Sequence, residues 1–113
     1  MKKPDLKLCR LKADVIQAVA HPFRVAVIEV LSEGELCVCD IARAIGAQRS
    51  NVSRHLGVML QAGVVEVRKD GLRMIYSLRT PCVQGFLECV TNVVREQARQ
   101  SSAVLKRLQG VAG

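Results

Sequence analysis

The chain has 113 residues, of which 50% are hydrophobic, 24% charged and 3% aromatic, and its formal net charge at pH 7 is +7. This length and apolar content predict one globular domain, residues 1–113, whose core needs no disulfide bonds. No apolar run is long enough to cross a bilayer, and the first lysines precede Pro4 and Asp5 rather than an apolar stretch. We therefore expect a cytoplasmic protein with no secretory signal and no membrane partner.

The N-terminal part predicts two helices. Four apolar residues at helical spacing indicate a helix from Leu6 to Val19 with one buried side: Leu8, Leu11, Val15 and Val19. A second helix begins at Pro22, because the residue before a proline leaves the α region and proline suits a first helical turn. We expect this helix to end near Ser32.

Residues 41–62 form a helix-turn-helix pattern. Ile41, Ala42 and Ile45 make one apolar face, with Asp40 in the first turn of that helix, and Gly46 ends it. The second helix begins near Gln48 and turns four residues inward: Val52, Leu56, Met59 and Leu60. Its exposed start is polar and predicts DNA contacts, with base edges read by Arg49, Asn51, Ser53 and His55 and phosphates bound by Ser50 and Arg54. His55 has a second interpretation, a structural side chain between this helix and the following hairpin.

A β-hairpin follows. Gly63 is expected to end the second helix of the helix-turn-helix, which is the predicted DNA recognition helix. Two β-rich runs, Val64–Arg68 and Leu72–Leu78, then flank the strong turn signal Asp70-Gly71. A hairpin after a helix-turn-helix is a wing, with Arg68, Lys69 and Arg73 at or near its tip, within reach of DNA phosphates. Residues 43–79 hold seven basic side chains against two acidic ones, which favours a polyanionic partner.

The last segment predicts a helix that starts with Thr80 as N-cap and Pro81 in the first turn. Its apolar residues recur with a period between 3.5 and 3.6, typical of a helix that packs along another helix. We expect part of this stripe, together with the N-terminal helix, to pair with a second protomer, so that both are dimerisation helices. The two recognition helices of a homodimer then suit an inverted-repeat operator. The whole pattern is ααααββα, mainly α with a small β-hairpin.

Five cysteines is an odd number, and reduced cytoplasmic thiols do not form a structural disulfide framework. Cys37 and Cys39 directly precede the helix-turn-helix, where thiolates near a helix start bind soft ions well. If both lie in the first helical turn they point about 200° apart, so joint chelation would require that turn to unwind. Cys82 and Cys89 lie seven residues apart in the last helix, too far to share an ion there, and are either buried hydrophobes or secondary sensor candidates.

Four segments together resemble the ArsR/SmtB family of metal-responsive repressors: HPFR at 21–24, ELCVCDIA at 35–42, SNVSRHL at 50–56 and IYSL at 75–78. The resemblance covers nearly the whole chain. It implies a homodimeric winged-helix repressor that binds operator DNA without a cofactor and leaves it when an inducer binds.

The resemblance also narrows the inducer site. The family's zinc site in the last helix needs histidines, and His21 and His55, the only two, lie elsewhere. The segment ELCVCDIA at 35–42, called the cysteine box below, is similar to the corresponding segment of arsenite sensors. It has Ala42 where those sensors have a third cysteine. It is more similar to that of cadmium and lead sensors, which add N-terminal thiols such as Cys9. The implied ligands are Cys37, Cys39 and Cys9, for arsenite, antimonite, cadmium or lead, with Cys9 from the same or a second protomer.

Three other functional classes of protein are alternatives to a metal-responsive repressor. A redox or reactive-sulfur sensor would use a reversible disulfide, for example Cys82 with Cys89 of a partner. A thiol oxidoreductase would need a nucleophile–base arrangement and a thioredoxin-like βαβ pattern, which the sequence lacks, and a metal-buffering protein has no use for a winged helix. We therefore predict a regulator and not an enzyme.

Overall fold

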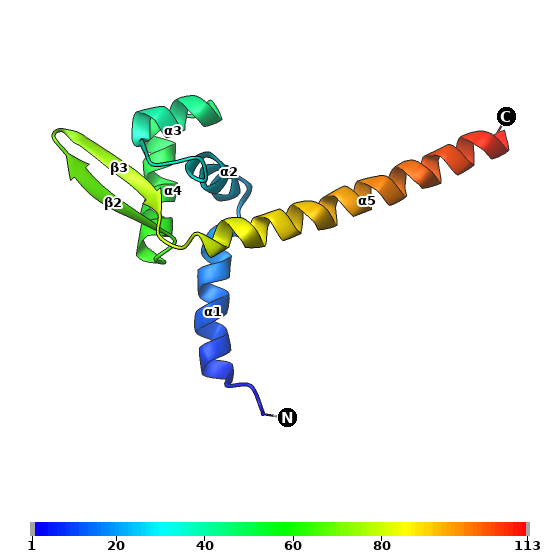
Figure 1. Ribbon diagram of the computed structural model, residues 1–113, viewed down its shortest axis with the longest axis horizontal. Coiled ribbons are helices and arrows are strands. Elements are labelled where there is room, and N and C mark those ends of the chain that lie inside the picture. Colours follow the sequence, from blue (N-terminus) through cyan, green and yellow to red (C-terminus); the bar gives the residue numbers. More distant parts are fainter. Residues whose placement is uncertain (1, 113) are drawn as a thin grey trace. The chain divides into compact units, whose positions relative to one another are not determined.

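The computed structural model describes the backbone of residues 2–112 and the side chains of residues 2–110. Its elements in chain order, labelled in Figure 1, are α1 (Leu6–Val19), α2 (Pro22–Leu31), β1 (Leu36–Cys37), α3 (Val38–Ile45), α4 (Arg49–Gln61), β2 (Val65–Asp70), β3 (Arg73–Leu78) and α5 (Cys82–Ala112). Residues up to Pro81 form one compact unit and those from Cys82 onward a second. The first unit is a winged helix-turn-helix, which confirms the predicted fold class.

One strand was not predicted. β1 pairs antiparallel with β3, through Leu36 opposite Tyr76 and Cys37 opposite Ile75, so the sheet order is β1-β3-β2. Two residues are too few to show the alternation that reveals a strand in sequence. The strand matters because it fixes Cys37 against the wing, β2 and β3, immediately before α3 begins.

The core of the first unit lies between α2, α3, α4 and the start of β2. Its largest fully buried side chains come from these four elements and the turn before β2: Ile28, Ile41, Leu56, Met59, Val27, Val52, Val64 and Val65. Three of the four α4 residues predicted to face inward are buried, but Leu60 is 38% exposed, so its assignment to the core was wrong. It lies on the edge of the apolar stripe, one position beyond Met59.

Two glycines set the turns of this unit. Gly46 ends α3 in the left-handed conformation (φ +77°), as predicted, and this lets the chain reverse into α4. The hairpin turn lies one residue later than expected: Asp70 pairs with Arg73, which leaves Gly71 (φ +64°) and Leu72 as the two-residue loop. A first loop residue with positive φ matches the twist of a two-residue hairpin.

Helix α1 has the predicted bounds but not the predicted burial. Asp5 caps it, accepting hydrogen bonds from the backbone N–H groups of Lys7 (3.0 Å) and Leu8 (3.4 Å). Only Ala18 and Val19 are buried, whereas Leu8 and Leu11 are 51% and 61% exposed. Most of the apolar side of α1 is therefore exposed in a single chain, because the other helices of the first unit meet only the C-terminal end of α1. The pairing of this helix with a second protomer stays a prediction.

Helix α5 begins at Cys82, one residue after the proline that was expected in its first turn. Seven of its large apolar side chains are exposed: Phe86, Val90, Val93, Val94, Val104, Leu105 and Leu108. Between residues 2 and 112, no helix is long and apolar enough to cross a bilayer.

Candidate DNA-binding surface and thiol site

The first two turns of α4 present the polar side chains predicted to contact DNA. Gln48 caps the helix in an extended conformation, and Arg49, Ser50, Ser53 and Arg54 are exposed. Asn51 is half-buried and its side-chain oxygen accepts a hydrogen bond from Arg54 Nη2 at 2.7 Å. A cavity of about 430 Å³ is lined by Gln48, Ser50, Asn51 and Arg54. The start of α4 is therefore an open, cationic surface with several hydrogen-bond donors.

His55 does not belong to that surface, and its prediction as a base-reading residue was wrong. Its side chain is only 8% exposed and stacks on Phe23, with 4.5 Å between ring centroids. Arg24 Nε donates a hydrogen bond to His55 Nδ1 at 3.2 Å, and the His21 ring lies 4.7 Å away. Burial, together with the charges of His21, Arg24 and Arg54, lowers the pKa of His55. The imidazole is a neutral structural group between α2 and α4, not at the wing.

Arg24 has a structural role that was not predicted from its place in the HPFR motif. Besides holding His55, its Nη1 donates to the backbone oxygen of Ala18 at 3.3 Å, so one guanidinium joins α1, α2 and α4. The motif His21-Pro22-Phe23-Arg24 is the sequence feature that could have indicated this role. It supplies the cap of α2, the ring that stacks on His55 and the cation that donates to His55. His21 Nδ1 accepts the backbone N–H of Phe23 at 3.1 Å and caps α2.

The three basic residues of the wing differ in their partners. Arg68 makes a bidentate pair with Glu35, through Nε at 3.3 Å and through Nη2, and lies 3.8 Å from Asp70. The hydrogen bond to Arg68 lowers the pKa of Glu35, although burial acts in the opposite direction, and the same bond raises the pKa of Arg68. Lys69 is exposed, and the guanidinium of Arg73 turns toward α3. Only part of the predicted cationic tip is therefore free of acidic partners.

The two cysteines of the box lie at different places in the backbone. Cys37 is the N-cap of α3, extended (φ −80°, ψ 165°) and buried, whereas Cys39 is exposed in the first helical turn. Both line a cavity of about 430 Å³ together with Arg49, Ser50 and Ser53 of α4 and Arg73 of β3. Because Cys37 precedes the helix, the opposed directions expected for two residues of one turn do not apply to this backbone.

Both sulfurs accept hydrogen bonds from arginines of the DNA-binding elements. Arg49 Nη1 lies 3.2 Å from Cys39 Sγ, and Arg73 Nη2 lies 3.0 Å from Cys37 Sγ. Cys37 Sγ also donates to Asp40 Oδ2 at 3.2 Å, an oxygen that lies 3.5 Å from Arg73 Nη2. The hydrogen bond to Cys37 raises the pKa of Arg73, and the nearby carboxylate of Asp40 raises it further. Sequence spacing offered no sign of these contacts, because they join residues 10 and 36 positions apart.

The remaining cysteines lie outside this cavity. Cys9 is exposed on α1, Cys82 and Cys89 are exposed on α5, and all five thiols are free. Within the described part of the chain, no three His, Cys, Asp or Glu side chains gather closely enough to hold a metal ion. A three-sulfur site built from Cys9, Cys37 and Cys39 of one protomer is therefore not formed. The two thiols that share a cavity are the soft donor set of this site, which suits a thiophilic ion that completes its coordination from elsewhere.

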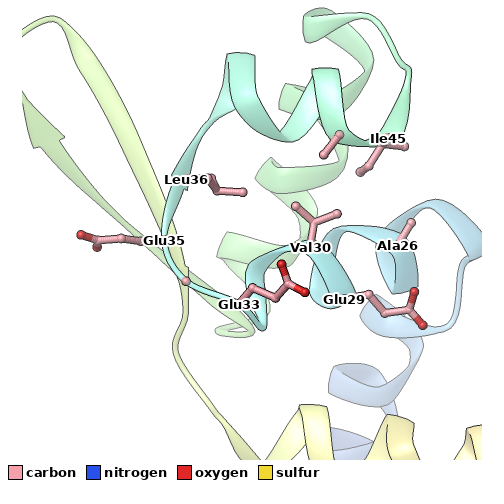
Figure 2. A pocket seen from close by; sticks show the side chains of 9 residues that line it. Ala26, Glu29, Val30, Glu33, Glu35, Leu36 and Ile45 are labelled. Atoms are coloured by element: carbon pink, nitrogen blue, oxygen red, sulfur yellow. The ribbon is translucent and has the colours of Figure 1, made fainter.

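A larger cavity, of about 640 Å³, lies between α2, the Gly34 turn, β1 and α3 (Figure 2). Its side chains include Glu29, Glu33, Leu36 and Ile45, and none of the predicted site residues lines it. In Figure 2 the side chain of Glu35 points away from Glu29, in keeping with its pairing to Arg68 of the wing.

Comparison with known proteins places this geometry in a family. The model of the arsR family of bacterial regulatory proteins matches residues 21–67. The HTH-type transcriptional regulator Rv0081 of Mycobacterium tuberculosis is 36% identical over 103 residues, 90% of each chain. Its crystal structure matches with a TM-score of 0.72 at 34% identity and covers 88% of this chain and 97% of that one.

Two further proteins are similar. The solution structure of the homodimeric winged helix-turn-helix DNA-binding domain Mb0332 of Mycobacterium bovis has a TM-score of 0.74 at 29% identity, covering 87% of this chain and 93% of that one. The CadC homolog of Staphylococcus aureus, a cadmium resistance transcriptional regulatory protein, is 39% identical over 77 residues, 67% of this chain and 64% of its own length. The chain therefore belongs to the arsR family of bacterial regulatory proteins and is a winged helix-turn-helix transcriptional regulator.

Proposed function

We propose that this protein is a homodimeric cytoplasmic repressor that binds an inverted-repeat operator and releases it when a thiophilic ion binds Cys37 and Cys39. One observation carries the proposal: both thiols line the same cavity as the first turn of α4 and the first residue of β3. An ion bound there lies against both elements that contact DNA in a winged helix. Arsenite, antimonite, cadmium and lead are the ions that such thiolates favour.

In the proposed complex α4 enters the major groove. The exposed donors at its start contact bases and phosphates, and Lys69 and Arg73 of the wing contact the backbone. Two α4 helices related by a two-fold axis would read half-sites about 34 Å apart. The homodimeric Mb0332 domain supports this arrangement by analogy.

The identity of the ion rests on the thiol set. Cys37 and Cys39 supply two sulfurs, and Cys9 of the second protomer is the proposed third, since Cys9 does not join them within one chain. The name of the Staphylococcus aureus relative, a cadmium resistance regulator, supports an ion of this class. A 100-fold weakening of DNA binding requires about 2.7 kcal/mol of coupling, which soft-ion–thiolate bonds can supply.

The proposal is tested by fluorescence anisotropy of a labelled fragment of the protein's own promoter. The reduced protein is titrated at fixed salt, because phosphate contacts make the affinity steeply salt-dependent. Near-stoichiometric arsenite, antimonite, cadmium or lead should release the DNA from the wild type, and the Cys37→Ser and Cys39→Ser variants should remain bound.

Cys82→Ser is the matched control, since this exposed thiol lies outside the cavity and should leave ion release intact. Release by an oxidant alone, abolished in Cys82→Ser and Cys89→Ser, would instead identify a redox sensor built on α5. Failure of the wild type to bind the promoter specifically would refute repression itself.

A further inference from the structure

Two of the arginines predicted to contact DNA are bound to the two thiols of the cavity. Arg49 is the first residue of α4 and donates to Cys39 Sγ. Arg73 is the first residue of β3 and donates to Cys37 Sγ. Two other arginines of this surface have different partners: Arg54 bonds Asn51, and Arg68 bonds Glu35. The pairing of arginine with sulfur is thus specific to one residue of α4 and one of the wing.

The Arg73 contact belongs to a closed network. Cys37 donates its S–H to Asp40 Oδ2 while accepting from Arg73, and the other oxygen of Asp40 lies 3.3 Å from Arg43 Nη1. Cys37 itself is only 5% exposed, so this network fixes Arg73 to a rigid part of the unit. Arg73 keeps 63% of its side chain exposed, which leaves part of the guanidinium open to a phosphate.

We propose that Arg49 and Arg73 are positioning residues that transmit the state of Cys39 and Cys37 to the recognition helix and the wing. With free thiols, each guanidinium bonds its sulfur and holds the first turn of α4 or the start of β3 against α3. A thiophilic cation displaces the two thiol protons to solvent, binds the resulting thiolates and repels the guanidiniums, so both elements lose this anchor. The effect on DNA rests on the proposed function, whereas the arginine–thiol link does not.

A double-mutant cycle on the metal-free, reduced protein tests the exposed pair. Cys39→Ala and Arg49→Met should each weaken operator binding, the former by roughly 10-fold, the size of one hydrogen bond to a charged group. The double variant should bind no more weakly than Arg49→Met alone, because the two substitutions remove the same contact. Cys39→Ala combined with Arg54→Met is the matched control and should be additive, since Arg54 bonds Asn51 instead.

Serine provides a rescue that a purely structural role would not show. Cys39→Ser retains a hydrogen-bond acceptor and should bind the operator more tightly than Cys39→Ala. Because Cys39 is exposed, neither variant threatens the fold. Equal affinities of the serine and alanine variants, or additivity in the Cys39–Arg49 cycle, would overturn the proposal.

The ion-dependent arm uses cadmium as the probe. Cadmium should weaken wild-type operator binding roughly 100-fold, and the Arg49→Met/Arg73→Met variant, already weakened, should lose less than a further 5-fold. Thiolate-to-cadmium absorbance should show that this variant still binds the ion. Arg54→Met/Lys69→Met removes the same charge from α4 and the wing, with Lys69 on β2 instead of β3, without touching a sulfur contact, and it should retain the full cadmium response.

A readout without DNA separates this inference from the proposed function. The guanidinium NMR signals of Arg49, whose Nη1 donates to Cys39 Sγ, should shift in Cys39→Ala and on adding cadmium, while those of Arg54 should not. An unchanged Arg49 signal in Cys39→Ala overturns the link, whether or not the protein binds its promoter. Failure of the wild type to bind the promoter, with the Arg49 signal shifting as expected, would count against repression alone.

Discussion

At the scale of single residues, His55 shows how one contact converts a polar side chain into a structural one. Its neighbours in sequence, Arg54 and Ser53, are exposed, yet its ring stacks on Phe23 and accepts from Arg24. A protonated imidazole has no free lone pair and so cannot accept that hydrogen bond. The packing between α2 and α4 therefore depends on the neutral ring.

This dependence predicts a loss of stability in mild acid. Because the folded state lowers the pKa of His55 below 6.5, the unfolded chain binds the proton more tightly. The stabilisation from the neutral ring is complete above pH 6.5 and is lost as the pH falls through the lowered pKa of the folded state. Urea midpoints at pH 7.5 and pH 5.5 should therefore differ more for the wild type than for His55→Gln.

Glutamine is the suitable replacement because its side-chain oxygen can still accept from Arg24 but does not titrate. Glu35 also has a lowered pKa, but the stability that it contributes is lost only below about pH 4.5, outside the range between pH 5.5 and pH 7.5. An identical pH dependence for the wild type and His55→Gln would show that His55 does not contribute.

At the scale of elements, α4 carries two functions on one short helix. Its inward face packs Val52, Leu56 and Met59, each fully buried, against the rest of the first unit. Its outward face presents the donors predicted to contact DNA. The two faces meet at Leu60, which the spacing assigned to the core and the structure leaves 38% exposed.

Two leucines of α4 therefore make a matched pair of substitutions. Leu56→Ala removes a fully buried side chain and should lower the free energy of unfolding by about 2–5 kcal/mol. Leu60→Ala makes the same chemical change at a partly exposed position and should cost less than about 1.5 kcal/mol. Chemical denaturation of both variants is the measurement. Equal losses would contradict the observed boundary of the core.

At the scale of the whole molecule, the exposed apolar side chains call for a partner. α1 exposes Leu6, Leu8, Leu11, Val15 and Ile16, and α5 exposes the seven large apolar residues from Phe86 to Leu108. Apolar stripes of this extent on two helices are typical of association surfaces. A second copy of the chain, as in the homodimeric Mb0332 domain, is the partner that we propose.

The dimer is tested by analytical ultracentrifugation. The wild type should sediment with twice the chain mass of 12.4 kDa, and Val94→Glu should shift it toward the monomer by placing a charge on the α5 stripe. Asn92→Asp adds the same charge to the same helix two positions before Val94, about 160° away around the helix, and should leave the mass unchanged. A monomeric wild type, or a dimeric Val94→Glu variant, would refute α5 as the interface.

The sequence by itself determined the helices, the turn glycine Gly46, the wing and the family, because helical spacing, caps and turn residues are local signals. The bounds of α1 agree with the prediction, and those of α2 and α4 lie within about a residue of it. The pair Cys37 and Cys39 was also found from sequence, although the placement of Cys37 outside the helix was not. A two-residue strand leaves no periodicity from which to predict it.

Only the tertiary structure decided which polar side chains are free. Burial of His55, the pairing of Arg68 with Glu35 and the contacts of Arg49 and Arg73 with sulfur all join residues from separate elements. Such contacts depend on how α2, α3, α4 and the wing pack together, and spacing along the chain carries no record of that packing. The sequence thus identified the candidate thiols and cationic residues, and the fold decided which of them meet.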